Sequence, residues 1–442
     1  MLLAFALGAC ADGPRAPQRV LLLVLDTTHG DQLGCQGGPA GLTPNLDALA
    51  AGGMRFDRAL ANTTWTLPST ASLMSGRLPY SHGVLTTGDR MPDDALLVAE
   101  LFAAAGWRTA AFVQMVYASD GYGLGQGFEH ARYYSKESER PPDTEVIAEV
   151  LQWMDETEGE PAFLYVHLRR PHSPYQPGPE VWSQLEQDCP LAESPAAQAL
   201  ARADSMLIPE GGLSAAQRDH VEHLYLGNLA TIDHLLEPLL SRAQASDDTL
   251  VVVTSDHGEG LGQHGDYGHG NYLHAENVDI PLIFVGPGVV PGVDTHPASS
   301  VDVLPTLAAL CGLPVPTGHD FDGRSLASRL SGRWAGTPSP VVLVGKHRTN
   351  GMPEVGLVEG DYKLVLASDG MARLHHRRDD RAERTDLRTE RSEVTVRMRD
   401  AAVDYRREHV LTAGERTSAD APTVTTAEQE ALAELGYLGE DH

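Results

Sequence analysis

RVLLLVLD, residues 19–26, is the stretch that decides the fold class, because it is almost continuously apolar and ends on a carboxylate. A strand that is buried on both faces of a parallel sheet has this composition. Similar apolar runs recur at residues 162–168, 250–254, 281–285 and 341–344. Segments with a helical pattern lie between them, at residues 95–105, 144–156, 215–242 and 301–310. This alternation predicts an α/β fold with a large, mostly parallel central sheet flanked by helices.

The length of the chain indicates more than one structural unit, since 442 residues exceed the usual size of a single core. We predict a signal and linker at residues 1–18, a catalytic α/β domain at 19–337 and a C-terminal subdomain at 338–442. In this last part the apolar segments become short, as in GLVEGDYKLVLAS, and a helix-like RMRDAAVDYRREH follows. We therefore expect a small α+β subdomain with an antiparallel sheet and one helix.

Polar side chains follow three of the predicted strands at the point where each strand ends. Asp26 follows the first strand, and Asp256 and His257 follow LVVVTS. His167 lies at the end of AFLYVHL, and His172 follows it. In open parallel sheets, ligands bind outside the carboxyl ends of the strands. The sequence therefore predicts a polar site at this edge of the sheet.

The segment ANTTWTLPSTASLMSG, residues 61–76, carries a candidate nucleophile. Pro68 and Ser69 suit the first turn of a helix, which places Thr66 just before a helix N-terminus. The free backbone amides and the helix dipole favour an anion there, so a hydroxyl attacking phosphorus or sulfur would find its transition state partly stabilised. From the residues alone, an N-cap threonine with no further role is the favoured interpretation of Thr66.

The formal net charge of −28 excludes nucleic acid as a partner and argues against binding to an anionic membrane surface, because both need a basic face. The same negative charge would repel an anionic substrate. An enzyme with this charge must overcome the repulsion locally, and a bound metal cation is the simplest means.

The N-terminus, MLLAFALGACADG, places an apolar run before a Leu-Gly-Ala-Cys sequence that resembles the lipobox of bacterial lipoproteins. Lipidation would fall on Cys10 and would attach the protein to a membrane. No Lys or Arg precedes the run, so the positively charged start of a signal peptide is missing. Two locations stay open: the bacterial cell envelope, as a periplasmic or membrane-anchored lipoprotein, and the cytoplasm. The cysteines form no CxxC pair, so neither a zinc ribbon nor a dithiol motif is indicated.

Residues 24–84, from VLDTTHGDQLG to GRLPYSHGV, resemble the N-terminal signature of the sulfatase family of the alkaline phosphatase superfamily. HLRRPHSPYQP, VVVTSDHGEGLGQHGDYGHG and IPLIFVGPGV follow in the order that this family shows, and LAELGYLG resembles its C-terminal ending. The resemblance implies the family's α/β fold with a small C-terminal subdomain. It also implies a metal-dependent hydrolase of sulfate, phosphate or phosphonate esters, acting on a small-molecule, glycan or lipid ester.

The resemblance also implies roles for the matching positions. Asp26, Asp256 and His257 would bind a divalent metal ion, and Thr66 would be the nucleophile and approach the same metal. His172, in PHSPY, would contact the transferred group or the leaving oxygen.

His269, in GHG, would bind or protonate the substrate. His264 could join a second metal site with Asp266, although each histidine taken singly could be an ordinary surface or core residue.

Four positions depart from the sulfatase pattern. Thr66 stands where sulfatases carry the cysteine or serine that becomes formylglycine, and Thr70 stands where they carry arginine. Thr27 replaces an aspartate, and His257 stands where many sulfatases have asparagine. Threonine cannot give the aldehyde by that modification, so phosphorus esters are favoured over sulfate esters. The shift from oxygen toward nitrogen ligands favours zinc or manganese over calcium or magnesium.

Two other functions remain as alternatives. One is a transferase that moves a phospho-substituent onto an acceptor, although relatives of that kind usually carry several membrane spans. The other is a sulfatase-like binding protein without catalysis, which the loss of the arginine and one aspartate would favour. Metal content and covalent labelling of Thr66 would separate this last alternative from the enzymes.

Overall fold

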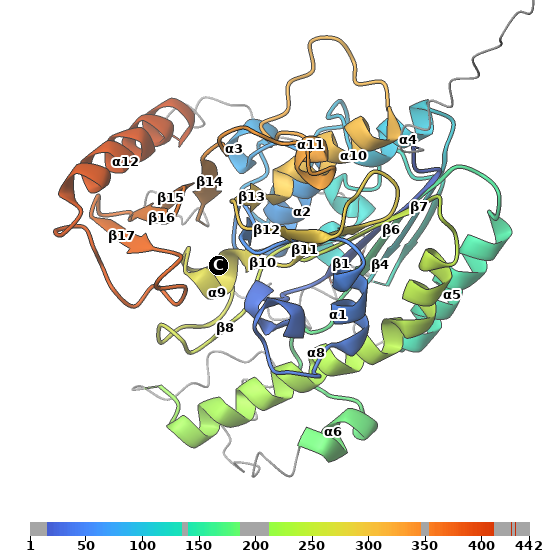
Figure 1. Cartoon of the computed structure of the whole chain (residues 1–442), viewed down its shortest axis with the longest axis horizontal. Helices are drawn as coiled ribbons and strands as arrows, with labels where there is room; N and C mark the ends of the chain where they lie inside the picture. Colours follow the sequence, from blue (N-terminus) through green and yellow to red (C-terminus); the bar gives the residue numbers. More distant parts are fainter. Residues whose placement is uncertain are drawn as a thin grey trace, which may run out of the picture.

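The computed structural model describes residues 16–134, 140–185, 212–345 and 353–410, together with positions 426 and 429. Cys10, most of the predicted signal and the terminal LAELGYLG lie outside the described residues. At the centre is an eight-stranded sheet with the strand order β12-β2-β11-β7-β1-β6-β4-β5 (Figure 1). Its strands are β1 (Arg19–Leu25), β2 (Met54–Phe56), β4 (Arg108–Val113), β5 (His130–Tyr133), β6 (Ala162–Leu168), β7 (Thr249–Thr254), β11 (Leu282–Val285) and β12 (Gly292–Asp294).

The middle of this sheet is parallel, as predicted. β1 pairs in parallel with β6 on one side and with β7 on the other, so that Val24 has both His167 and Thr254 as register partners. β11 runs antiparallel to β7 and β2, which makes the whole sheet mixed. The predicted fold class is confirmed, and β11 is the strand that runs opposite to its neighbours in the sheet.

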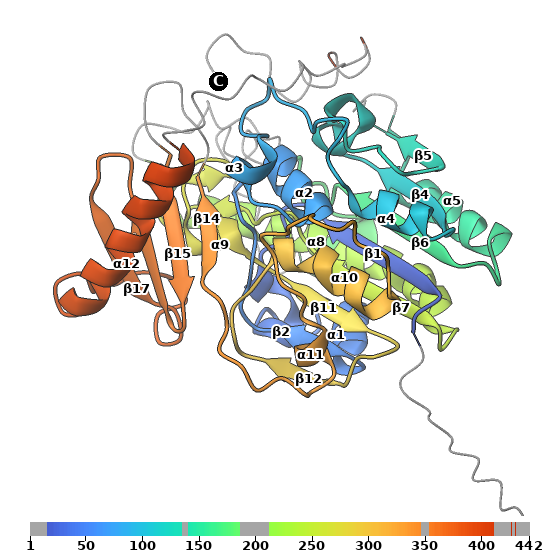
Figure 2. The same cartoon turned by 90° about the horizontal axis from the view of Figure 1, so that it is seen from above.

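Helices cover both faces of the sheet (Figures 1 and 2). The even-numbered side chains of β1 join the core beneath one group of helices, and the odd-numbered ones join the core on the other face. The first group contains α2 (Thr66–Ser75), α4 (Val98–Ala104) and α10 (Val303–Cys311). The second contains α1 (Pro44–Ala51), α5 (Asp143–Glu156) and α8 (Ala215–Gln244). Asp26 continues the even series, so it faces the side of the sheet that α2 covers.

The shorter elements connect these layers. The helices are α3 (Pro79–His82), α6 (Pro179–Leu185), α9 (Ala275–Val278) and α11 (Ala327–Leu330). The strands are β3 (Ala59–Leu60), β8 (Gly260–Leu261), β9 (Tyr267–Gly268), β10 (Asp279–Ile280) and β13 (Ala298–Ser299). Among the described residues, none of the helices has the length and apolar composition that a bilayer span requires.

The C-terminal part forms the predicted antiparallel sheet with one long helix, drawn in orange and red in Figure 1. Its elements, in order, are β14 (Val341–Val344), β15 (Val355–Glu359), β16 (Tyr362–Leu366), β17 (Ala372–His376) and α12 (Ser392–Tyr405). The run at residues 341–344, which we grouped with the strands of the main sheet, belongs here. An apolar strand composition reports burial, and β14 is buried against the catalytic part without pairing with its sheet.

A buried ion cluster joins the two parts. The ammonium group of Lys363 is fully buried and donates to the Leu273 carbonyl and to Glu383, with Nζ–Oε1 at 2.8 Å. Arg377 bonds both Glu383 and Asp279. Burial alone would raise the pKa of Glu383, but the charges of Lys363 and Arg377 outweigh it and lower that pKa to about 2. The cluster therefore stays ionised at neutral pH.

Candidate active site

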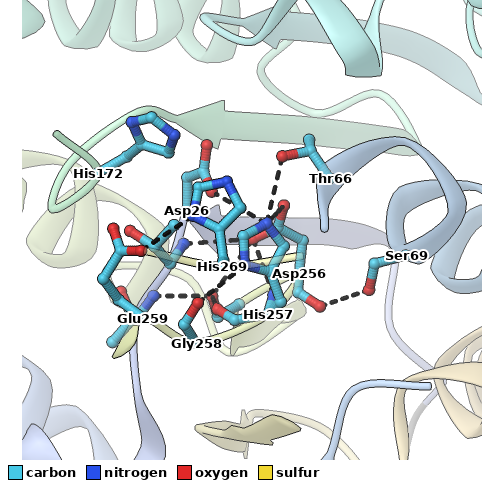
Figure 3. Close-up of polar contacts among 12 residues, drawn as sticks. Asp26, Thr66, Ser69, His172, Asp256, His257, Gly258, Glu259 and His269 are labelled. Carbon is cyan, nitrogen blue, oxygen red and sulfur yellow. Dashed lines mark hydrogen bonds and ion pairs between the residues drawn. The ribbon is translucent and has the colours of Figure 1, made fainter. Parts of the chain in front are cut away.

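Four of the predicted site residues come together where β1 and β7 end and α2 begins (Figure 3). Asp26 and Asp256 are fully buried, and a carboxylate oxygen of each lies within 4.8 Å of a ring nitrogen of His257 and of the other. The Nε2 atom of His257 is 3.3 Å from Asp256 Oδ2 and 3.8 Å from Asp26 Oδ1. It is also 3.2 Å from the Oγ1 atom of Thr66.

The start of α2 is held against this cluster. The helix begins at Thr66 itself, one position earlier than the sequence predicts, with Trp65 as the N-cap. The Ser69 hydroxyl donates to the backbone carbonyl of Asp256 and ties the first turn of the helix to the end of β7. The Thr66 side chain therefore lies at a helix N-terminus, where backbone amides and the dipole favour negative charge.

The turn after β1 is strained and supports the carboxylates. Thr27 has a φ of 55°, in the left-handed region that is a genuine outlier for a β-branched residue. This conformation lets its N–H donate to Asp256 Oδ1 at 3.3 Å. The hydroxyl of Tyr225 donates to the Thr27 carbonyl at 2.9 Å and accepts from the N–H of His29 at 3.1 Å. Such a conformation costs on the order of 1–3 kcal/mol and persists only where its surroundings enforce it.

The cluster fits a divalent cation. Both side-chain oxygens of Asp26 and the Oδ2 of Asp256 are buried and accept no hydrogen bond from a described residue. Burial, together with the nearby charge of Asp256, raises the pKa of Asp26 well above its usual range. Two buried carboxylates at this spacing, with three oxygens that lack hydrogen bonds, are costly unless a positive charge lies between them. A metal ion bound by Asp26, Asp256 and His257 would remove that cost.

The protonation of His257 suits a metal ligand. Its Nδ1 atom is 2.9 Å from the carbonyl oxygen of Gly258, which accepts the Nδ1 hydrogen. Burial lowers the pKa of His257, so the ring is neutral and its Nε2 presents a lone pair to the carboxylates and to Thr66. Metal-binding histidines usually have this arrangement, with the second ring nitrogen bonded to a carbonyl or carboxylate.

Two further predicted residues lie beside the cluster. The His269 ring is 4.5 Å from the His257 ring and 5.1 Å from the His172 ring, measured between centroids. Burial, with the charge of Arg169, lowers the pKa of His172 well below its usual range, so this ring is neutral. The Gly270 N–H donates to the carbonyl of Thr64 at 2.7 Å, which fixes the loop that carries His269 close to the start of α2.

His264 and Asp266, the two residues considered for a second metal site, contact other groups. The Nδ1 of His264 is 2.9 Å from Glu276 Oε1, and its ring stacks on the ring of His274 with centroids 4.1 Å apart. Asp266 approaches His274 instead, at 4.0 Å. Within the ranges that the structure describes, only Asp26, Asp256 and His257 form a group of metal-binding side chains.

The sequence analysis missed three polar neighbours of the site. Glu259 is buried, and its Oε1 is 2.9 Å from His269 Nδ1 while its Oε2 accepts from the Tyr175 hydroxyl at 3.0 Å. Arg169 is buried close enough to lower the pKa values of Asp26 and His172. Glu259 could have been found from its place two residues after His257 in the same motif, whereas the partners of Tyr175 and Arg169 are set only by the fold.

Comparisons with known proteins agree with this fold. The family model described as Sulfatase matches residues 18–313. The choline-sulfatase of Rhizobium meliloti (strain 1021) is 25% identical over 412 aligned positions, covering 79% of this chain and 78% of that protein. Human arylsulfatase A is 31% identical over 368 positions, covering 75% of this chain and 71% of that protein. The crystal structure of a phosphonate monoester hydrolase of Agrobacterium radiobacter superposes with a TM-score of 0.72 at 22% identity, over 89% of this chain and 96% of that one.

Proposed function

The chain belongs to the sulfatase family of the alkaline phosphatase superfamily, whose members hydrolyse sulfuric and phosphoric esters, and we propose that its nucleophile is Thr66. The observation that carries the proposal is the position of the Thr66 hydroxyl. Its oxygen lies 3.2 Å from His257 Nε2, at the first residue of α2. Beside it are three buried carboxylate oxygens, both of Asp26 and the Oδ2 of Asp256, that accept no hydrogen bond from a described residue.

Asp26, Asp256 and His257 would hold the metal ion. When bound there, a divalent ion would lower the pKa of a coordinated hydroxyl and offset negative charge on the transferred group. The donor set of two carboxylates and an imidazole supports zinc or manganese, with calcium or magnesium as the other candidates. The free amides at the start of α2 would stabilise the same charge from the protein side.

His172 and His269 would bind the substrate on the other side of the cluster. The carboxylate of Glu259 accepts the Nδ1 hydrogen of His269. It would also stabilise a second proton on Nε2, and the ring can donate a hydrogen bond or a proton to the substrate from Nε2 only in that form. His172 is neutral, and its Nδ1 hydrogen is donated to the Ser173 carbonyl. Its Nε2 has no partner among the described residues and would therefore accept a hydrogen bond from a protonated oxygen of the substrate. Arg169 adds a buried positive charge, which favours an anionic group in this space.

The reaction would proceed by in-line attack of the Thr66 oxygen on phosphorus or sulfur, with the hydroxyl proton passing to solvent. The bond to the leaving alcohol breaks, and that oxygen takes a proton, with His269 as the donor. Water then cleaves the covalent ester on Thr66 and regenerates the hydroxyl. Because a threonine hydroxyl attacks directly, without the aldehyde chemistry of formylglycine, we propose that phosphate or phosphonate esters are preferred over sulfate esters.

The organic part of the substrate would be a small molecule, a glycan or a lipid headgroup. We propose that a lipid on Cys10 attaches the protein to a bacterial membrane, where such substrates would be within reach.

A kinetic comparison of two variants tests the proposed nucleophile. Thr66→Ala should abolish metal-dependent turnover of nitrophenyl phosphate, phosphonate and sulfate esters by the full-length protein. Ser75→Ala, a buried hydroxyl at the far end of the same helix, is the matched control and should keep activity.

Residual activity of Thr66→Ala equal to that of the control would refute the nucleophile. Turnover of sulfate esters alone would refute the preference for phosphorus. An acceptor requirement would indicate the transferase, and absence of both metal and turnover would indicate the binding protein.

A further inference from the structure

A second buried histidine borders the metal cluster, at the end of the neighbouring strand. His167 lies on β6 and pairs in register with Val24 of β1, which also pairs with Thr254 of β7. Side chains alternate between the faces of a strand, so Asp26 and Asp256, two positions after these partners, follow on the same face. The fold therefore aims His167, Asp26 and Asp256 at one place.

One nitrogen of this histidine has no partner. His167 is fully buried, and its Nε2 makes no hydrogen bond with a described residue. Asp256 Oδ2 lies 4.0 Å from this nitrogen, and that oxygen also accepts no hydrogen bond from a described residue. A buried polar atom without a hydrogen bond needs an explanation, and here two of them face one another. The separation is too long for a direct hydrogen bond.

The separation is compatible with a shared metal ion. Two atoms that each lie about 2.1 Å from one ion are at most about 4.2 Å apart, and about 3.4 Å apart at a tetrahedral angle. The pair can therefore share an ion after a shift on the order of half an ångström. The other ring nitrogen, Nδ1, is 2.9 Å from the Tyr165 hydroxyl. An N–H at Nδ1 donated to that oxygen would leave the Nε2 lone pair directed at the cluster.

We propose that His167 is a further ligand of the metal ion held by Asp26, Asp256 and His257, through Nε2. The inference rests on the proposed function, because it presupposes that this cluster binds a metal. It assigns the ion two imidazole and two carboxylate ligands from the protein. Tyr165 is then a positioning residue that fixes the tautomer and the orientation of the ring.

X-ray absorption of the zinc-loaded, full-length protein tests the ligand set directly. The wild-type protein should bind zinc with two imidazoles in its coordination shell, and His167→Ala should retain one. Changes in groups that only support a ligand weaken metal affinity by about 10–100-fold, so removal of a ligand should cost at least that much in a chelator competition. Tyr165→Phe is the matched control and should keep both imidazoles, with a smaller loss of affinity.

Three results would overturn the proposal. A single imidazole in the wild-type protein would exclude His167 without recourse to a variant. An unchanged imidazole count in His167→Ala would do the same, even if affinity fell, and would leave His167 outside the coordination shell. A wild-type protein that binds no zinc or manganese would refute the proposed metal site as well. Metal binding without His167 as a ligand would refute only the role of His167. Circular dichroism and urea unfolding of the metal-free proteins confirm that the variants are folded.

Discussion

Replacement of Asp26 by asparagine should stabilise the metal-free protein and make its stability indifferent to metal. In the absence of a cation, Asp26 and Asp256 are both fully buried, and their ligand oxygens lie within 4.8 Å of one another. Two unit charges at that separation repel by about 3.5 kcal/mol at an effective dielectric constant of about 20. Asparagine removes this repulsion and breaks no hydrogen bond, because the side-chain oxygens of Asp26 accept none from the described residues.

The effect should depend on pH with a defined sign. Burial and Asp256 raise the pKa of Asp26 in the folded protein, so the folded state binds the proton more tightly than the unfolded state. The destabilisation is absent below the unfolded pKa of about 3.9 and grows as the pH rises toward the folded pKa. Each unit of difference between the two pKa values corresponds to about 1.4 kcal/mol. The advantage of Asp26→Asn should therefore be greatest above the folded pKa of Asp26 and disappear near pH 4.

Urea unfolding in chelator and in excess zinc measures both effects. A metal present at about 1,000 times its Kd should add about 4 kcal/mol to the wild-type protein and much less to Asp26→Asn. The reasoning would be refuted if the chelated variant were less stable than the wild-type protein across the pH range, or if zinc stabilised both proteins equally.

Three further changes probe the neighbouring groups. Glu259→Gln should lower kcat by about 10–100-fold with a smaller change in KM, because it loosens the orientation of His269. An equal loss of kcat in Glu237→Gln, which changes a distant carboxylate, would contradict this role. His172→Asn should raise KM for every ester in the panel, and an unchanged KM would remove it from the substrate site. Lys363→Met should reduce the free energy of unfolding by about 3–5 kcal/mol, because it leaves Glu383 buried with one cation fewer. A reduction of less than about 1 kcal/mol would show that Arg377 alone satisfies the Glu383 carboxylate.

Much of the central sheet could be predicted because its strands are short, apolar and bounded by polar residues. The runs at residues 19–25 and 162–168 form strands with those same bounds. Strand direction and sheet membership were harder to predict. A buried strand has the same composition whether it runs parallel or antiparallel, so the sequence did not distinguish β11 from its neighbours, nor β14 from the strands of the main sheet.

The candidate site followed from the ordered motifs, because Asp26, Thr66 and Asp256 each sit at a recognisable end of a strand or start of a helix. The structure brings them together, but their chemical roles stay predictions. His167 and Glu259 were not assigned because their significance depends on partners that are distant in the sequence. The hydrogen bond of Glu259 to Tyr175, for example, spans 84 positions. A local pattern contains no information about such contacts.

The most direct test of the central claim is to trap the covalent intermediate. The metal-loaded, full-length protein would be mixed with a nitrophenyl phosphonate or phosphate ester, quenched in acid during turnover and digested for mass spectrometry. The account predicts a phosphoryl or phosphonyl group on Thr66, absent from the Thr66→Ala variant. Turnover that proceeds at the same rate in Thr66→Ala, or a modification carried by a different residue, would contradict it.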